Sequence, residues 1–235
     1  MDSNIAQVKI SAIIPAAGDG LRFGGSIPKQ FKNIGGCPLL LHAVQPFVAS
    51  SKITEIIIAV PPDWIGEISE LIADIDNGQK IKLVAGGERR QDSVSNGLQA
   101  VAPDTDIVVI HDAGRPFVTE KMIDDCISAC EHHAGAILAM PARDTVKSVA
   151  AGGHHIEGTI PRSTIWLAQT PQAFQKDILA AALQAADSEN ISGTDEAALV
   201  ERLGHQVAVV EGSPLNIKIT TPEDWQYAAT ILEQQ

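Results

Sequence analysis

The chain of 235 residues is 45% hydrophobic and carries a net charge of −12 at pH 7. This length predicts a single domain over residues 1–235, and the acidic balance argues against nucleic-acid binding through a basic surface. No apolar run approaches the roughly 18 residues of a membrane span. Three cysteines without zinc-site spacing and the lack of a signal peptide favour a reducing compartment, so we expect a cytoplasmic protein with no membrane partner.

The first predicted strand, residues 9–14, leads into a glycine-rich loop flanked by two cations, Arg22 and Lys29. Glycine lets backbone N–H groups approach a ligand closely, and such groups bind phosphate well. A loop directly after the first strand of an α/β sheet also lies where ligands usually bind. Phe23 replaces the third Gly or Ala of a dinucleotide fingerprint, and no P-loop pattern occurs. An ordinary turn is the alternative, but the two cations favour a phosphate-binding loop.

A second glycine site, Gly86 and Gly87, follows a series of alternating helices and strands. A helix is predicted over 93–101, with Asp92 or Ser93 as its cap. A helix N-terminus directly after a strand presents free N–H groups to a ligand, so this is a second candidate binding loop. The preceding predicted elements are a helix at 38–50, a strand at 53–60, a helix at 63–74 and a strand at 81–84.

Asp112 lies just past the end of a strand predicted at 106–110, and Arg115 follows three positions later. A carboxylate beyond the carboxyl end of a buried strand can hold a metal ion or a sugar hydroxyl. A plain turn residue is the alternative, but the nearby arginine favours a catalytic loop. With a helix at 119–133 and a strand at 136–140, the elements alternate as in an α/β domain with a mostly parallel sheet.

The segment from about 142 to 160 is short, polar and strand-like, with Gly152 and Gly153 at its middle. It predicts a protruding β-hairpin arm with little core of its own. A lone hairpin is marginal in water, so the arm should pack on something, and a partner subunit is the simplest candidate.

The C-terminal part predicts three more helices and two short strands. Thr194 is the expected cap of the middle helix, and Thr221 caps the last one. Lys218, in the second of these strands, is expected to face inward. The ranges are helices at 176–186, 196–203 and 225–232, and strands at 206–210 and 216–220.

Several segments, spread over nearly the whole chain, together carry a resemblance to a known family. The sequence resembles the 2-C-methyl-D-erythritol 4-phosphate cytidylyltransferases of the non-mevalonate isoprenoid pathway. Gly114 departs from the alanine expected in many members, and the loop before Asn216 is variable in that family. The matching segments, which stand in the order of the family, are 15–31, 85–94, 111–118, 142–147, 159–174, 193–204 and 216–225.

The resemblance implies a Rossmann-like nucleotidyltransferase domain that acts as a homodimer through its β-arm. It implies that CTP reacts with methylerythritol 4-phosphate, with Mg²⁺, to give the cytidine diphosphate alcohol and pyrophosphate. The substrate phosphate is already anionic at neutral pH, so catalysis needs positioning and charge neutralisation rather than a general base. No Ser/His/Asp or Cys/His set is visible in the sequence, in keeping with this chemistry.

The resemblance also implies a role for individual residues. A catalytic clamp on the phosphates is expected from Arg22, Lys29 and Lys218, and Arg162 is expected to be catalytic as well. Contacts to the nucleotide are expected from Ala16, Ala17, Gly18, Gly20, Gly87, Glu88 and Ser93. Contacts to the alcohol phosphate are expected from Asp112, Arg115, Thr145, Arg162, Thr170 and Thr194, with Thr145 and Arg162 supplied by the neighbouring subunit. No protein metal ligand is implied, because CTP phosphates would hold most of the Mg²⁺ coordination.

Three other functions are compatible with parts of this pattern. A ribitol 5-phosphate cytidylyltransferase would favour Ala-Gly-Gly where this chain has Ala16, Ala17 and Gly18. A glycosyltransferase would carry a D-x-D motif near a strand end, whereas residues 104–106 precede their strand. A non-catalytic nucleotide sensor would not need both cations of the first loop. The methylerythritol phosphate enzyme is therefore the predicted function.

Overall fold

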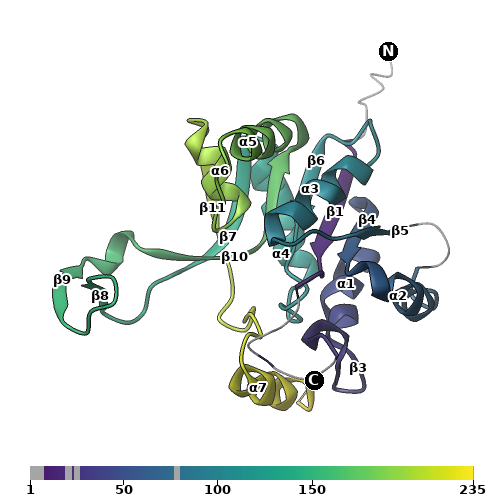
Figure 1. Cartoon of the computed structure of the whole chain (residues 1–235), viewed down its shortest axis with the longest axis horizontal. Helices are drawn as coiled ribbons and strands as arrows, with labels where there is room; N and C mark the ends of the chain where they lie inside the picture. The colour runs from purple at the N-terminus through teal and green to yellow at the C-terminus, as the bar shows by residue number, and fades with distance from the viewer. Residues whose placement is uncertain (1–7, 19–22, 24–26, 77–79, 235) are drawn as a thin grey trace.

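The computed structural model describes residues 8–18, 23, 27–76 and 80–234. Its centre is a seven-stranded sheet with the order β11–β7–β10–β6–β1–β4–β5 (Figure 1). Every pair of neighbouring strands is parallel except the two pairs that involve β10. The strands are β1 (Ile10–Pro15), β4 (Ile53–Val60), β5 (Ile81–Ala85), β6 (Ile107–Ile110), β7 (Gly135–Pro141), β10 (Trp166–Gln175) and β11 (Val207–Glu211).

Helices cover both faces of this sheet, because its central strands are apolar on both sides. Alternate residues of one strand join different cores: Ile14 packs in the cluster under α1, α2 and α4, while Ile13 packs in the cluster under α3, α5 and α6. The helices are α1 (Leu39–Ala49), α2 (Ile65–Ile72), α3 (Arg90–Ala100), α4 (Glu120–Cys130), α5 (Lys176–Ser188), α6 (Glu196–Arg202) and α7 (Pro222–Leu232). No helix in the described part of the chain is long and apolar enough to cross a bilayer.

A third, smaller cluster ties α7 to the N-terminal half of the molecule. It contains Leu39, Phe117 and Ile219, and Trp225 packs against it from α7. The hairpin of β2 (Asn33–Ile34) and β3 (Cys37–Pro38) contributes Ile34 to the same cluster. The C-terminal helix therefore lies beside the segment that follows the first glycine loop, at the lower end of the view in Figure 1.

Two of the predicted helix caps are wrong. Helix α3 begins at Arg90, so Arg89 is its N-cap and Asp92 lies inside the first turn, where it accepts from the Arg89 N–H. Helix α6 is capped by Asp195, whose carboxylate accepts from the backbone N–H of Ala198, and not by Thr194. The Thr221 cap of α7 is confirmed.

Two strand predictions also differ from the structure. Strand β10 was not predicted, because its polar residues and its proline do not give a continuous apolar run. The predicted strand at 216–220 does not form. Its residues alternate as in a strand, but its backbone is held by separate contacts rather than by a strand ladder. In one of them the Ile219 N–H donates to the Gly114 carbonyl at 2.8 Å.

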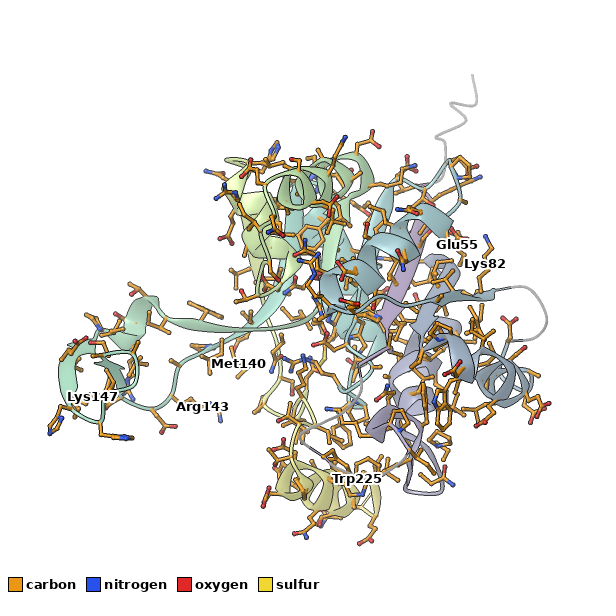
Figure 2. All side chains as sticks on the ribbon, in the orientation of Figure 1. Glu55, Lys82, Met140, Arg143, Lys147 and Trp225 are labelled. Atoms are coloured by element: carbon orange, nitrogen blue, oxygen red, sulfur yellow. The ribbon has the colours of Figure 1, made fainter. Side chains whose placement is uncertain are left out.

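The arm leaves the sheet at the end of β7 and returns into β10. Its hairpin consists of β8 (Val146–Val149) and β9 (Ile156–Ile160), and it extends far from the sheet (Figure 1). Met140, Arg143 and Lys147 mark the path outward in Figure 2. Exposed apolar side chains, including Ile156 and Leu167, lie on the hairpin and on the start of β10. The predicted α/β class with a protruding β-arm is confirmed, and the single-domain division stays a prediction.

Candidate active site

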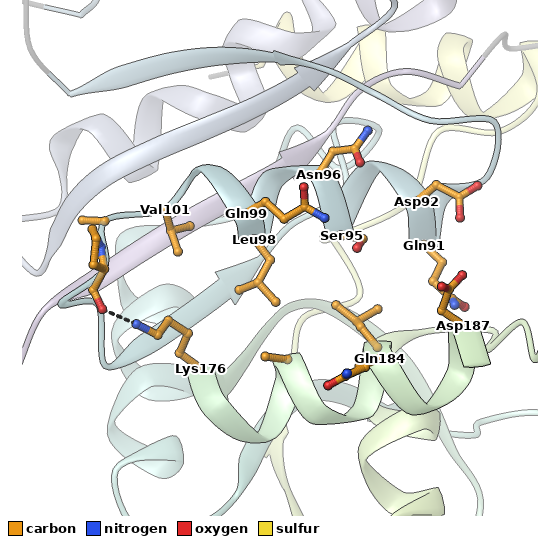
Figure 3. A pocket seen from close by; sticks show the side chains of 14 residues that line it. Gln91, Asp92, Ser95, Asn96, Leu98, Gln99, Val101, Lys176, Gln184 and Asp187 are labelled. Carbon is orange, nitrogen blue, oxygen red and sulfur yellow. Dashed lines mark hydrogen bonds between the residues drawn. The ribbon is translucent and has the colours of Figure 1, made fainter. Parts of the chain in front are cut away.

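Two hollows are candidates for the site. The groove between α3 and α5 has a volume of about 700 Å³ (Figure 3). It is lined by none of the residues predicted from the sequence, and Lys176, the one cation among its lining residues, donates to the Pro103 carbonyl. A cleft of about 520 Å³ instead lies at the carboxyl ends of β1 and β6, where open α/β sheets usually bind ligands. We therefore take the cleft as the active site.

The cleft collects most of the predicted nucleotide and clamp residues on its wall. Gly20 and Arg22 lie outside the described residues. Arg115, Arg162 and the three threonines predicted to contact substrate are not part of the wall. The predicted residues on the wall are Ala16, Ala17, Gly18, Lys29, Gly87, Glu88, Ser93, Asp112 and Lys218.

The described start of the first loop, residues 16–18, is anchored by Gln30, which was not among the predicted site residues. The Gln30 amide donates to the carbonyls of Ala16 and Gly18, at 2.7 and 2.9 Å. The Ala16 N–H donates to Ala59 on the neighbouring strand β4 at 2.7 Å. These bonds fix the exit of β1, so the backbone at 16–18 forms one side of the cleft.

The second loop packs closely against the first because it contains glycine. A Cβ atom built on Gly86 would lie 2.1 Å from the Ala17 Cβ, and one on Gly87 would lie 2.3 Å from the Asp92 Cβ. Such distances are not compatible with side chains at these positions. The Gly87 N–H donates to the Ser93 hydroxyl at 3.1 Å, which ties the loop to the first turn of α3.

Asp112 is the charged centre of the cleft floor. Its Oδ1 accepts from Arg90 Nε at 2.8 Å, and its Oδ2 accepts from Lys218 Nζ at 2.8 Å. Burial alone would raise the pKa of this carboxyl, but Arg90 and Lys218 outweigh burial and hold the pKa well below its usual range. Asp112 is therefore ionised at neutral pH and binds two cations in fixed positions.

Lys29 lies beside this pair on the other side of Gly114. Its ammonium donates to the Ile219 carbonyl. A Cβ atom on Gly114 would lie 3.7 Å from Lys29 Nζ and 3.8 Å from Lys218 Cγ, so the two lysine side chains flank this glycine. The charged residues on the wall are the cations Lys29, Arg89, Arg90 and Lys218 and the anions Glu88 and Asp112. The cleft is thus positive in a protein whose net charge is −12, which suits a polyphosphate ligand.

Arg90 and Glu196 are functional candidates that the sequence analysis missed. Arg90 Nη1 donates to both carboxylate oxygens of Glu196 at 2.8 Å, while its Nε holds Asp112. Burial raises the pKa of Glu196, and the Arg90 guanidinium opposes that shift. The two partners of Arg90 are 22 and 106 positions away in the chain, so local sequence carries no sign of the network.

Thr170 and Arg115 lie behind the cleft floor. The Thr170 hydroxyl accepts from the Asp112 N–H at 3.0 Å and is 3.0 Å from His111 Nδ1. His111 Nε2 is 3.0 Å from the Arg115 carbonyl, and Arg115 donates to the Asn216 carbonyl at 2.7 Å. Both side chains are buried, so they support Asp112 from below.

The remaining predicted substrate residues are exposed and lie outside the cleft. Thr194 precedes α6, and its side chain is exposed. Thr145 and Arg162 belong to the arm, which extends away from the sheet in Figure 1. Arg162 donates to the Arg143 carbonyl within the arm. One chain therefore does not bring Thr145 and Arg162 to its own cleft.

The comparisons with known proteins agree with this geometry. The sequence profile described as 2-C-methyl-D-erythritol 4-phosphate cytidylyltransferase matches residues 10–234. Curated proteins of that name from Geobacter metallireducens and Syntrophus aciditrophicus are 44% and 46% identical to this chain. They align over 96% and 97% of this chain and over 98% and 97% of their own lengths.

Solved structures give the same result. The 4-diphosphocytidyl-2C-methyl-D-erythritol synthase from Anaerococcus prevotii superposes with a TM-score of 0.86 at 32% identity, covering 97% of this chain and 99% of its own. The 2-C-methyl-D-erythritol 4-phosphate cytidylyltransferase from Thermus thermophilus superposes with a TM-score of 0.78 at 30% identity, covering 96% and 100%. The chain therefore belongs to the 2-C-methyl-D-erythritol 4-phosphate cytidylyltransferase family, as its sequence segments had indicated.

Proposed function

We propose that this cytidylyltransferase moves the cytidylyl group of CTP to 2-C-methyl-D-erythritol 4-phosphate, giving 4-diphosphocytidyl-2-C-methyl-D-erythritol and pyrophosphate. The observation that carries this proposal is the positive cleft at the carboxyl ends of β1 and β6, in a chain that belongs to this family. Two glycine loops and several fixed cations meet there, as binding a triphosphate requires.

The chemistry is an in-line displacement at the α-phosphorus of CTP. A phosphate oxygen of the methylerythritol phosphate forms the new bond to phosphorus, and the bond to the β-phosphate oxygen breaks as pyrophosphate leaves. The nucleophile is already an anion, so the protein has only to align the two substrates and stabilise the growing charge. Lys29 and Lys218 are suited to this because backbone and carboxylate contacts hold both ammonium groups in place. We assign the same role to Arg22, which lies outside the described residues.

The two loops would divide the recognition of CTP between them. Backbone at Ala16, Ala17 and Gly18 would run along the nucleotide, with Gly20 continuing it outside the described residues. Gly87, Glu88 and Ser93 would meet the cytosine and its ribose. A site that hydrogen-bonds one base edge rejects other bases because buried polar groups are then left unpaired. CTP should therefore be strongly preferred over ATP.

Asp112 would bind the second substrate on the floor of the cleft. Its fixed carboxylate can accept from hydroxyl groups of methylerythritol, while Lys218 beside it faces the phosphates. Arg115 and Thr170 would act on this substrate through Asp112 and the backbone around it, because both side chains are buried and already contact the Asn216 carbonyl and the Asp112 N–H. Thr194 would have to approach from the exposed loop before α6.

Magnesium would be carried mainly by the CTP phosphates. In such sites Mg²⁺ commonly keeps several waters and takes one or two carboxylates besides substrate phosphates. The carboxylates on the described cleft wall are Glu88 and Asp112, and both oxygens of Asp112 already accept from cations. This donor set fits a metal held largely by the triphosphate, where it would neutralise charge on the phosphates. The protein residues would then orient the nucleotide rather than encircle the ion.

The arm would complete the cleft of a second subunit in a twofold dimer. Thr145 and Arg162 are exposed on the arm, and apolar side chains beside them are exposed as well. Mixing two inactive variants, Lys29→Ala and Arg162→Ala, tests this directly. In a mixed dimer one site carries both lesions and the other carries neither, so activity should recover to roughly a quarter of wild type, given closed twofold symmetry. No recovery, with subunit exchange shown independently, would reject a shared site.

Pyrophosphate release by the purified protein tests the proposed reaction. CTP with 2-C-methyl-D-erythritol 4-phosphate should give rapid, Mg²⁺-dependent release, and omission of either substrate should abolish it. Ribitol 5-phosphate in place of the methylerythritol phosphate is the matched comparison, since it presents a similar phosphate on a different alcohol. Faster release with ribitol 5-phosphate would assign the chain to that sibling activity instead. Release with neither alcohol would reject both.

A further inference from the structure

Two buried carboxylates share one guanidinium beneath the cleft. Arg90 donates through Nη1 to both oxygens of Glu196 and through Nε to Asp112, each at 2.8 Å. Glu196 is 1% exposed and does not belong to the described cleft wall, so a bound substrate cannot touch it. The start of α3, the start of α6 and the loop after β6 are therefore joined through a single side chain.

The nucleotide side of the cleft does not depend on Glu196. The Gly86 N–H donates to the Val60 carbonyl at 2.8 Å, and the Gly87 N–H donates to Ser93. At the N-terminus of α3, the Arg89 N–H and the Arg89 guanidinium both donate to the Asp92 carboxylate, at 3.0 and 2.6 Å. These contacts fix the second glycine loop by themselves, so a change at Glu196 should leave CTP binding nearly unaffected.

Hydrogen bonds that do not involve Glu196 also hold α6 and the loop before it in place. The Gln91 amide donates to the Ile191 carbonyl at 3.3 Å and accepts from the Gly193 N–H at 3.1 Å. Asp195 caps α6 and accepts from Gln172 on β10 at 2.9 Å. These contacts hold the loop before α6 without the Glu196 carboxylate. The carboxylate itself binds Arg90.

We propose that Glu196 is a positioning residue for the second substrate: it orients Arg90, and Arg90 in turn holds the Asp112 carboxylate toward the cleft. Among the described residues, the hydrogen bonds of the Arg90 side chain go to Asp112 and Glu196, so loss of the Glu196 charge weakens the contact that orients the guanidinium from the far side. The inference rests on the proposed function, since Asp112 is there assigned to the methylerythritol phosphate.

The test is the Glu196→Gln variant, which keeps the shape of the side chain and removes its charge. We expect kcat/KM for methylerythritol phosphate to fall by ~10-fold or more, which lies within the usual range of coupling between contacting residues. The Kd of CTP, measured by titration without the second substrate, should stay within about 2-fold of wild type, since separate contacts fix that loop. Glu201→Gln is the matched control, because Glu201 lies on the same helix with its side chain exposed.

A double-mutant cycle with Arg90→Met separates positioning from general structure. If Glu196 acts through Arg90, adding Glu196→Gln to the Arg90→Met variant should change kcat/KM by no more than about 2-fold. Additive losses would overturn the inference, and so would unchanged kinetics in Glu196→Gln. The double variant removes the charges of Arg90 and Glu196 together and leaves Asp112 paired with Lys218, which proteins tolerate better than a lone buried charge. If Glu196→Gln fails to fold, the double variant should still bind CTP yet show the loss toward methylerythritol phosphate, and full activity there would overturn the inference.

These outcomes are distinct from failure of the proposed function. A wild-type protein that releases no pyrophosphate from CTP and methylerythritol phosphate would remove the function itself. An active wild type with an equally active Glu196→Gln variant would remove only the role of Glu196.

Discussion

Two buried carboxylates lie at opposite ends of the strands of the same sheet, and their surroundings show how a binding site differs from a group that only stabilises the fold. Asp112 follows the carboxyl end of β6, and Glu55 lies near the amino end of β4. Glu55 accepts from Ser11 and Lys82, each at 2.7 Å, and from the Ala102 N–H. Figure 2 shows Glu55 and Lys82 side by side at the edge of the molecule. Both carboxylates have hydrogen-bond partners for their two oxygens, yet only Asp112 lies in the cleft.

The difference lies in the balance of charge around each carboxylate. One lysine faces Glu55, so the pair is neutral and needs nothing more. Around Asp112 the described wall has the cations Lys29, Arg89, Arg90 and Lys218 against the anions Asp112 and Glu88. Glu196 and Asp92 pair with Arg90 and Arg89, and buried Arg115 lies 3.8 Å from Asp112. When these neighbours are included, five cations face four anions, so one positive charge remains in excess. A surplus of fixed cations that open onto a cleft marks a site for an anionic ligand, whereas a closed, neutral cluster marks stability.

The largest expected effect is the loss of one of the surplus cations. Lys29→Ala should lower turnover by roughly 10²-fold or more, the usual scale for removing one preorganised stabilising group. The free energy of unfolding should change little, because Lys29 lies on the cleft wall and not in an apolar cluster. Turnover and denaturant unfolding of this variant check both statements. Lys121→Ala, which changes an exposed lysine of α4, is the matched control. Near-normal turnover in Lys29→Ala would contradict the clamp.

The fold and the site could be predicted from the sequence to different extents. The apolar runs of β1, β4 and β6 and the glycine loops after β1 and β5 are local patterns, so the sheet and two walls of the cleft were predictable. Strand β10 was not, because its burial depends on its place between β6 and β7 rather than on its own composition. The roles of Arg90 and Glu196 were not predictable either, since their contact joins positions that are 106 residues apart.

A smaller effect concerns the histidine behind the cleft floor. Burial lowers the pKa of His111 to about 4, from an ordinary value of 6.5. As the pH falls below 6.5, the unfolded chain takes up a proton that the folded chain refuses until about pH 4. His111 therefore reduces the free energy of unfolding over that interval, by at most about 1.4 kcal/mol per pH unit.

Denaturant unfolding between pH 7 and pH 4 measures this effect. The His111→Asn variant should lose stability less steeply than wild type as the pH falls, because it has no proton to take up when unfolded. If the free energy of unfolding falls equally steeply with pH in both proteins, His111 takes up its proton at the same pH in the folded and the unfolded chain. That result would contradict the lowered pKa of the buried His111 side chain.

The comparison of the two carboxylates is tested most directly by neutralising each of them in turn, as Asp112→Asn and Glu55→Gln. At a temperature where both variants are folded, Asp112→Asn should lose roughly 10²-fold in kcat/KM, on the scale of a lost preorganised group. Glu55→Gln should keep kcat/KM within about 2-fold while its free energy of unfolding falls by about 1–3 kcal/mol, the cost of unpairing a buried hydrogen-bonding group. An equal loss of kcat/KM in the two variants, or full activity in Asp112→Asn, would contradict the assignment of the catalytic site to the cation-rich edge of the sheet.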